Sequence, residues 1–369
     1  MNIGPAATGT GTARPWNELE PRSVWSGRAS YVIGAAVALA AAAIALWGSV
    51  ILVLRATEVA VFAVAFVGLH LLSGRLGLIS VGHGAFVGFG ALTAAHAIDD
   101  LSLPYLLAPL AGLVGGGVAG AVIAAPSLRL PGAYVALLTL AVAMVLPIAM
   151  RQLDGPLGYR LDGDFLPPAW TGLAESEAAR WQYLVVVVVG AGLVALTHLI
   201  VRGRFTRSMI AVRDDRGAAA AFGIAPARVQ LLGVGLSAGL AGAAGGLGLY
   251  ASPLVAGDQY PFSLSVAMFA LMLALGASRA WTALPAAVIL VFLPEVLIRL
   301  GWPQWIPIVY AVVLLVMTRV SRGRGLLSVL DRFVKALTVE DEPVAGIDPA
   351  LLDDPNPWLL TAEPDTIDR

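Results

Sequence analysis

The residues that could take part in chemistry lie in a segment of small and apolar side chains, residues 77–95, in which His83 is the only titratable group. An imidazole in such a segment could contact a substrate carboxylate, because polar groups within membrane spans tend to face cavities. It could also hydrogen-bond across a helix interface, and the small neighbours favour this second role. Gly82, Gly84, Gly88 and Gly90 also allow a broken helix that presents backbone groups at mid-membrane.

A second candidate is the charged segment 202–228, which separates two apolar stretches. The run 208–222 has the composition of one or two short helices, with Gly223 as a stop and Pro226 just beyond it. A short amphipathic helix between two spans suits docking into a groove on a cytosolic partner. Composition alone supports equally well a basic loop that lies on the membrane and only fixes the topology.

The remaining charged candidates indicate structure rather than catalysis. Glu295 precedes Arg299 by one helical turn, and we expect a topological ion pair near the outer interface rather than a gating or proton-transfer role. The sequence has no cysteine, metal-ligand spacing, nucleophile-elbow motif or nucleotide loop of the GxxxxGK[ST] type. We therefore expect no enzyme, no metal site and no cofactor in this chain, and no nucleic-acid partner.

The elements that must position these residues are membrane helices. The chain has 369 residues, of which 58% are hydrophobic and 13% charged, and a mean hydropathy of +0.83. Because a span needs about 20 apolar residues, this composition predicts an all-α, polytopic transmembrane helical bundle with about ten spans. The expected spans are Tyr31–Val53, Thr57–Leu72, Ile79–Ala97, Pro104–Ala125, Gly132–Met150, Trp181–Val201, Val229–Tyr250, Ser263–Gly276, Thr282–Arg299 and Gln304–Met317.

Charge placement predicts the orientation of the bundle. Lysine and arginine accumulate in cytoplasmic loops, and a ten-span chain with both termini cytoplasmic puts every large basic cluster on that side. The long outer loop 151–180 is then net acidic. We expect a disordered cytosolic segment at 1–30, a transmembrane domain at 31–320, and a basic, then acidic cytosolic tail at 321–369.

Four motifs, in order, resemble permeases of the branched-chain amino acid group of ABC importers. Ser80-Val-Gly-His-Gly-Ala-Phe86 is similar to the family's Ser-Leu-Gly-His-(Ala/Gly)-Ala-Phe, and Leu128-Arg-Leu-Pro-Gly-Ala-Tyr134 with Ala136–Ala141 is similar to its "LRLRGPYFAIVTLA". Ala211-Val-Arg-Asp-Asp215, followed by Ala218-Ala219 and Gly223-Ile224, resembles its coupling segment. Val320-Ser-Arg-Gly-Arg-Gly-Leu326 resembles its exit from the last span.

The resemblance implies an importer of the bacterial plasma membrane. In such an importer the pore is formed by two permease subunits, which are either two copies of this chain or this chain and a sister chain. Two cytosolic ABC ATPases bind ATP, and an extracytoplasmic binding protein delivers substrate. Transport would follow ATP-driven alternating access. The implied ATPase-coupling residues are Arg213, Asp214, Asp215, Ala218, Ala219, Gly223 and Ile224. The candidate pathway or packing residues are Ser80, Gly82, His83, Gly84, Phe86, Gly88, Gly90, Tyr134 and Thr139.

Three other functions remain open from the residues. A permease for urea or short-chain amides shares these motifs, and Arg75 and Leu78 replace an aromatic residue and a glutamine that commonly precede the histidine motif. An ion-coupled secondary transporter would place carboxylates deep in the membrane, and a membrane-embedded enzyme would need a polar cluster at one depth. The sequence contains neither pattern.

Overall fold

The computed structural model describes residues 28–320 except 129–132, 156, 162–164, 168–173, 175–176, 202 and 277–279. These residues fall within one compact unit, Met1–Ser328. The predicted tail at 321–369 and nearly all of the predicted N-terminal segment lie outside the described residues. The start of the first helix is described, and it begins at Arg28 rather than Tyr31.

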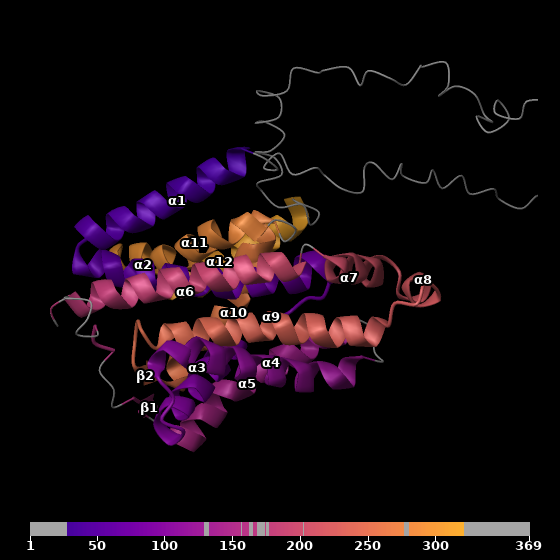
Figure 1. The fold of residues 1–369 in the computed structure, drawn as a ribbon, viewed down its shortest axis with the longest axis horizontal. Coiled ribbons are helices and arrows are strands. Elements are labelled where there is room, and N and C mark those ends of the chain that lie inside the picture. The colour runs from indigo at the N-terminus through magenta and orange to yellow at the C-terminus, as the bar shows by residue number, and fades with distance from the viewer. Residues whose placement is uncertain are drawn as a thin grey trace, which may run out of the picture. The chain divides into compact units, whose positions relative to one another are not determined.

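The described chain is mostly helical (Figure 1). Its α-helices are α1 (Arg28–Trp47), α2 (Val50–His70), α3 (His83–Asp100), α4 (Ala108–Ser127), α5 (Ala133–Asp154), α6 (Ala178–Val201), α7 (Arg204–Asp214), α8 (Arg216–Ala221), α9 (Pro226–Gly248), α10 (Phe262–Leu275), α11 (Ala283–Arg299) and α12 (Ile306–Val320). Shorter elements are the π-helix η2 (Leu71–Arg75), the 3-10 helices η3 (Tyr105–Leu107), η6 (Gly257–Gln259), η7 (Ala280–Thr282) and η8 (Pro303–Trp305), and the strands β1 (Tyr159–Arg160) and β2 (Leu254–Val255).

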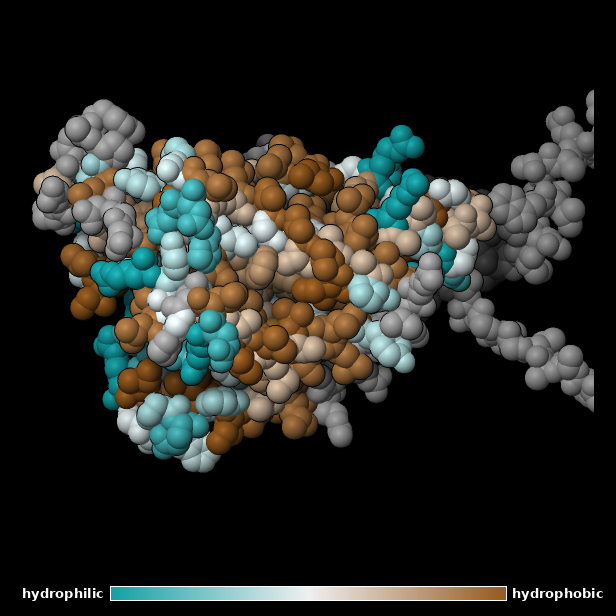
Figure 2. Space-filling model, turned by 90° about the horizontal axis from the view of Figure 1, so that it is seen from below, coloured by the Kyte–Doolittle hydropathy of each residue, from teal (hydrophilic) through white to brown (hydrophobic). Residues whose placement is uncertain are grey.

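Six helical segments of the described chain are long and apolar enough to cross a membrane: Val50–Arg75, Tyr105–Ser127, Tyr134–Leu153, Ala178–Val201, Pro226–Gly248 and Gly257–Leu275. Two shorter apolar helices are Ala36–Trp47 and Pro303–Val316. Figure 2 shows the corresponding surface: apolar side chains cover the middle of this face, and polar side chains gather toward its two ends.

The boundary predicted between the first two spans, at residues 54–56, is wrong. The chain breaks instead at Gly48 and Ser49, between α1 and α2. The Ser49 hydroxyl accepts a hydrogen bond from the Leu52 backbone N–H at 3.3 Å, which caps the first turn of α2. Hydropathy alone could not locate this break, because both sides of it are equally apolar.

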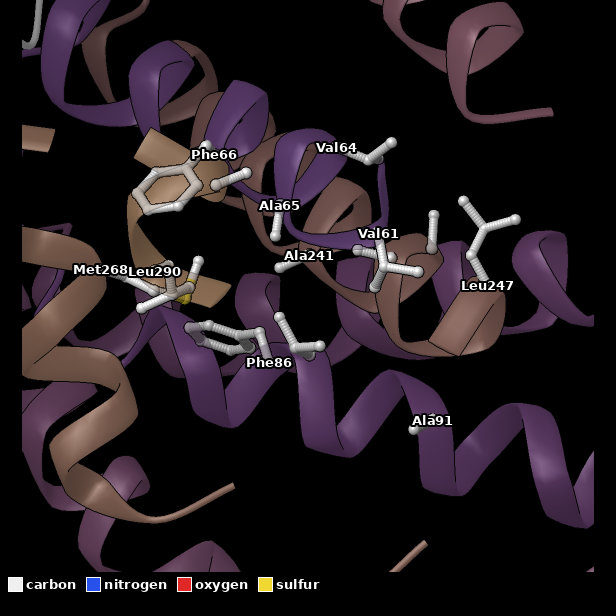
Figure 3. Packing of buried hydrophobic residues seen from close by; sticks show 14 of the residues in the cluster. Val61, Val64, Ala65, Phe66, Phe86, Ala91, Ala241, Leu247, Met268 and Leu290 are labelled. Carbon is white, nitrogen blue, oxygen red and sulfur yellow. The ribbon is translucent and has the colours of Figure 1, made fainter. Parts of the chain in front are cut away.

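The core is built around α9, which packs against α4, α3 and α2. Glycines bring these backbones together. A Cβ atom on Gly242 would lie 2.1 Å from the Gly112 carbonyl oxygen of α4, and one on Gly90 of α3 would lie 2.1 Å from the Gly242 Cα. Close approach of this kind is the reason for small residues in membrane interfaces. Around it, Phe66, Phe86, Met268 and Leu290 belong to one buried apolar cluster (Figure 3).

The expectation of a purely helical chain needs one correction, the pairing of β1 with β2. Tyr159 is paired with Val255, and Arg160 with Leu254, in antiparallel register. The Tyr159 hydroxyl also donates to Asp99 Oδ2 at the end of α3, at 2.6 Å. The strand β1, in the connection between α5 and α6, is therefore tied both to the segment after α9 and to α3.

Candidate functional site

Helix α3 begins deep beside α2, and the segment before it is not helical. Residues 76–82 connect η2 to α3, and Leu76, Leu78 and Ser80 in this connection are buried. His83, the first residue of α3, lies against Ala65, ten residues before the end of η2. Ten helical residues correspond to about 15 Å. The predicted start of a span at Ile79 is therefore four residues too early. Of the four glycines predicted to mark a broken helix, only Gly82 adjoins the break, because Gly84, Gly88 and Gly90 lie inside the continuous helix α3.

His83 makes a hydrogen bond across a helix interface. Its Nε2 lies 2.9 Å from the Ala65 carbonyl oxygen of α2, and the residue is completely buried. Since a carbonyl only accepts, Nε2 is the donor of this hydrogen bond. Nδ1 has no hydrogen-bond partner within the described residues. This geometry matches the packing role; a direct part in transport stays a prediction.

The other predicted residues of this segment lie close to His83 or one to two turns along α3. Thr139 of α5 accepts a hydrogen bond from the Val81 N–H at 3.2 Å, and a Cβ on Gly82 would lie 1.9 Å from the Thr139 carbonyl oxygen. A Cβ on Gly84 would lie 2.9 Å from Ser265 Oγ. The Phe86 ring is edge-on to His83 at 6.5 Å between centroids.

Two predicted pathway residues lie apart from this group. Gly90 contacts Gly242 in the core, and Tyr134 is 46% exposed on α5.

Gly88 faces the ring of Tyr260, whose Cγ would lie 2.7 Å from an added Cβ. The residues before and at the start of α10 thus cover the first turns of α3, and only glycine leaves them room.

Two buried serines complete the region around the start of α3. Ser80 Oγ and Ser265 Oγ have no hydrogen-bond partner within the described residues. Ser265 was not predicted, because its position on α10 gives no sequence signal that it meets α3. A buried hydroxyl without a partner costs free energy.

Two short helices, α7 and α8, occupy the predicted coupling segment. The Asp215 carboxylate separates them and accepts hydrogen bonds from the N–H groups of Gly217 at 2.7 Å and Ala218 at 2.9 Å, which caps α8. Gly223 has φ +80° and follows the end of α8, while the Ile224 N–H bonds back to the Ala219 carbonyl. This 6→1 bond is a standard helix stop.

The arginines of this segment attach it to the ends of membrane helices. The Arg213 guanidinium donates to the Gly74 carbonyl of η2 at 3.1 Å and pairs with Asp214 at 2.9 Å. Arg216 donates to the Leu128 carbonyl, just after α4, at 3.0 Å. Both cations therefore bind backbone oxygens of this chain.

The exposed residues of α8 and of the turn after it have mostly small, apolar side chains. Ala218 and Gly223 are exposed, whereas Ala219 is buried and Ile224 is half-buried. Phe222, at the end of α8, is 87% exposed. Phe222 was not predicted, since an aromatic residue after a run of alanines indicates a contact surface only once the orientation of the helix is known.

Charged groups at the opposite end of the bundle join α2 to α11. Glu295 pairs with Arg299 at 2.5 Å, as predicted, and also with Arg55 Nε at 3.3 Å. Arg55 in turn pairs with Glu58 at 3.0 Å. The Arg55 contact was not predicted because the two residues lie far apart in the sequence.

His70 links the end of α2 to η7. Its Nδ1 donates to the Phe66 carbonyl at 2.7 Å, and its Nε2 lies 2.5 Å from Thr282 Oγ1 of η7. In the part of the chain that the structure describes, no group of three His, Cys, Asp or Glu side chains could hold a metal ion.

Comparison of the sequence with known proteins identifies its family. Residues 51–318 match the family described as "Branched-chain amino acid transport system / permease component". The chain is 27% identical over 269 residues to the high-affinity branched-chain amino acid transport system permease protein LivM of Salmonella typhimurium, and equally to LivM of Escherichia coli. These alignments cover 66% of this chain and 62% of each relative, and no solved structure matches. The matched region contains nearly every described helix, so the chain belongs to the branched-chain amino acid transport permease family.

Proposed function

We propose that this chain is a membrane permease subunit of an ABC importer that moves branched-chain amino acids across the bacterial plasma membrane by ATP-driven alternating access. The observation that carries the proposal is the α7–α8 unit. It is capped, fixed by Arg213 and Arg216 to the ends of η2 and α4, and exposes a small apolar surface at Phe222. Such a surface suits a groove on a cytosolic partner. That partner is an ATPase pair that binds the ATP; a second permease completes the pore and an extracytoplasmic binding protein delivers substrate.

The topology in this proposal is the ten-span one. The helices α1–α6 and α9–α12 cross the membrane, and α7 and α8 lie in the cytosol on the same side as both termini. Contacts between the helix ends support it. Arg213–Gly74 and His70–Thr282 lie at the α7–α8 end, and Tyr159–Asp99 and Arg55–Glu295 at the other.

The contacts suggest how force would pass from ATPase to pathway. Movement of α8 would pull Arg216 and the end of α4, and movement of α7 would pull Arg213 and η2. The π-helix η2 leads directly into residues 76–82 and the start of α3 at His83. A π-helical turn is less regular than an α-helical one, and it is the element of this route best suited to change shape.

The test compares two exposed large apolar residues at opposite ends of the helical bundle. Phe222 is 87% exposed and Leu157 is 85% exposed. In cells with the complete transporter, we expect Phe222→Glu to lower both the recovery of ATPase subunits with the tagged chain and the uptake of radiolabelled leucine. Leu157→Glu is the matched control and should leave ATPase recovery unchanged. Normal recovery and uptake with Phe222→Glu would contradict the proposal, as would leucine uptake by the wild type that persists after ATP depletion.

A further inference from the structure

A pocket of about 440 Å³ lies between α5 and the start of α10, at the end of the bundle that carries β1 and β2. Its size falls within the range of about 300–1,000 Å³ that small-molecule sites occupy. The lining residues come from two stretches of the chain: Ala143, Met144, Pro147 and Arg151 of α5, and Gly257, Asp258, Pro261 and Phe262.

The two sides of the pocket, α5 and η6, meet in direct backbone contact. A Cβ on Gly257 would lie 2.4 Å from the Pro147 carbonyl oxygen, so η6 rests on α5 with no side chain between them. Beside this contact, Met144 is 58% exposed and Phe262 is 39% exposed. The pocket therefore offers open apolar surface on a fixed backbone support.

The pocket contains one charge of each sign. Arg151 Nη2 and Asp258 Oδ1 form an ion pair that joins α5 to η6, with side chains 56% and 68% exposed. The other lining residues are glycine, proline and apolar side chains. An ion pair this exposed contributes little to stability, so a ligand can separate the two charges at small cost.

We propose that this pocket is a binding site for the zwitterion of an apolar amino acid. The ligand carboxylate lies on the Arg151 guanidinium, its ammonium group on the Asp258 carboxylate, and its side chain on Met144, Pro147 and Phe262. One internal ion pair is replaced by two intermolecular ones. The inference rests on the proposed function only for the substrate class.

The charge pair explains why other small molecules fit less well. A simple carboxylate would leave Asp258 without a cation, and a simple amine would leave Arg151 without an anion. Urea carries no charge and would have to separate the pair without replacing either partner. The site thus selects an amino acid over urea, which the sequence motifs alone do not.

The position of the pocket connects it to the start of α3. Phe262 begins α10, and Ser265, one turn later, lies against Gly84 beside His83. A ligand held at Arg151 and Asp258 therefore lies next to α10, which contacts the first turn of α3 at Gly84, the neighbour of His83. Binding at the pocket and repacking at α3 share α10 as a common element.

The test measures direct binding of radiolabelled leucine to the full chain in lipid nanodiscs by scintillation proximity, without a binding protein. Competitors are 4-methylpentanoate, which lacks the ammonium group, 3-methylbutylamine, which lacks the carboxylate, and urea. We expect saturable leucine binding that each competitor displaces poorly. Because a hydrogen bond to a charged group is lost, Arg151→Gln and Asp258→Asn should each weaken leucine binding by about 10- to 100-fold. Arg299→Gln, which removes another exposed arginine of an ion pair and leaves Glu295 paired with Arg55, should bind leucine normally.

The competitors also distinguish the two charges. Asp258→Asn should abolish the preference for leucine over 4-methylpentanoate, and Arg151→Gln the preference over 3-methylbutylamine. Absence of saturable binding to the wild type, or equal binding by the two variants and the wild type, overturns the site. Leucine uptake by the complete transporter is measured separately: its absence in the wild type would refute the proposed function, whereas normal wild-type uptake with unchanged binding in the variants refutes only this pocket.

Discussion

Gly242 of α9 is a position where a single added methyl group meets the backbone of a neighbouring helix. An alanine Cβ there would lie 2.1 Å from the Gly112 carbonyl oxygen and 2.9 Å from the Gly116 Cα, both backbone atoms of α4. No side-chain rotation relieves these contacts, so α4 and α9 must move apart. Gly235 lies on the same helix and faces the same partner, but its Cβ would lie 3.4 Å from the nearest atom, the Gly117 carbonyl oxygen.

The expected magnitudes follow from two opposing effects. Overpacking a filled interface costs about 1–3 kcal/mol, and alanine is better than glycine inside a helix by about 1 kcal/mol. Because both obstructing atoms of Gly242 belong to backbone, the upper part of the first range applies, and Gly242→Ala should lower the free energy of unfolding by about 1–2 kcal/mol. Gly235→Ala meets only ordinary contact and should raise it by about 0.5–1 kcal/mol.

The two variants can be compared by unfolding the purified chain with SDS in mixed micelles, followed by tryptophan fluorescence. We expect Gly235→Ala to unfold at higher SDS fraction than the wild type and Gly242→Ala at lower, a separation of about 2 kcal/mol. Equal stability of the two variants, or a more stable Gly242→Ala, would refute the idea that backbone contact at Gly242 sets the distance between α4 and α9.

Substitutions at two further positions test the two ends of the proposed coupling route. Asp215→Ala removes the cap of α8 and should destabilise that helix by about 1 kcal/mol, and we therefore expect lower leucine uptake. Asp215→Asn keeps a capping oxygen and should restore uptake. Failure of this rescue would show that the negative charge, and not the cap, is required. His83→Gln, whose amide can still donate to the Ala65 carbonyl, should retain more uptake and more thermal stability than His83→Leu, which cannot. Equal uptake and equal thermal stability of the two His83 variants would contradict a role for this hydrogen bond.

Several elements followed from local patterns in the sequence. Apolar stretches of sufficient length indicated the long helices, and the glycine and proline after residue 222 indicated the end of α8. The four ordered motifs indicated the family, which the match over residues 51–318 confirms. These properties depend on residues close together in the chain, so no knowledge of packing was needed.

Other features could not be predicted because they depend on which distant residues meet. The break between α1 and α2 was misplaced, since hydropathy does not change across Ser49. The β1–β2 pair, the Arg55–Glu295 contact and the Arg151–Asp258 pocket each join segments separated by about a hundred residues or more. Tyr134 belongs to a family-like motif and yet is exposed, because the motif does not specify which face of α5 turns outward.

Local sequence patterns are enough to identify a helical membrane permease of a known family, with a charged segment between two apolar stretches. What the small residues and the charges do follows from the packing of the folded chain. Gly242 proved to be a backbone contact, His83 an inter-helix hydrogen bond, and Arg213 and Arg216 attachments to the chain's own carbonyls. The physical reason is that composition and periodicity report how each segment meets its solvent, whereas close packing and charge pairing depend on the partner that folding brings to it.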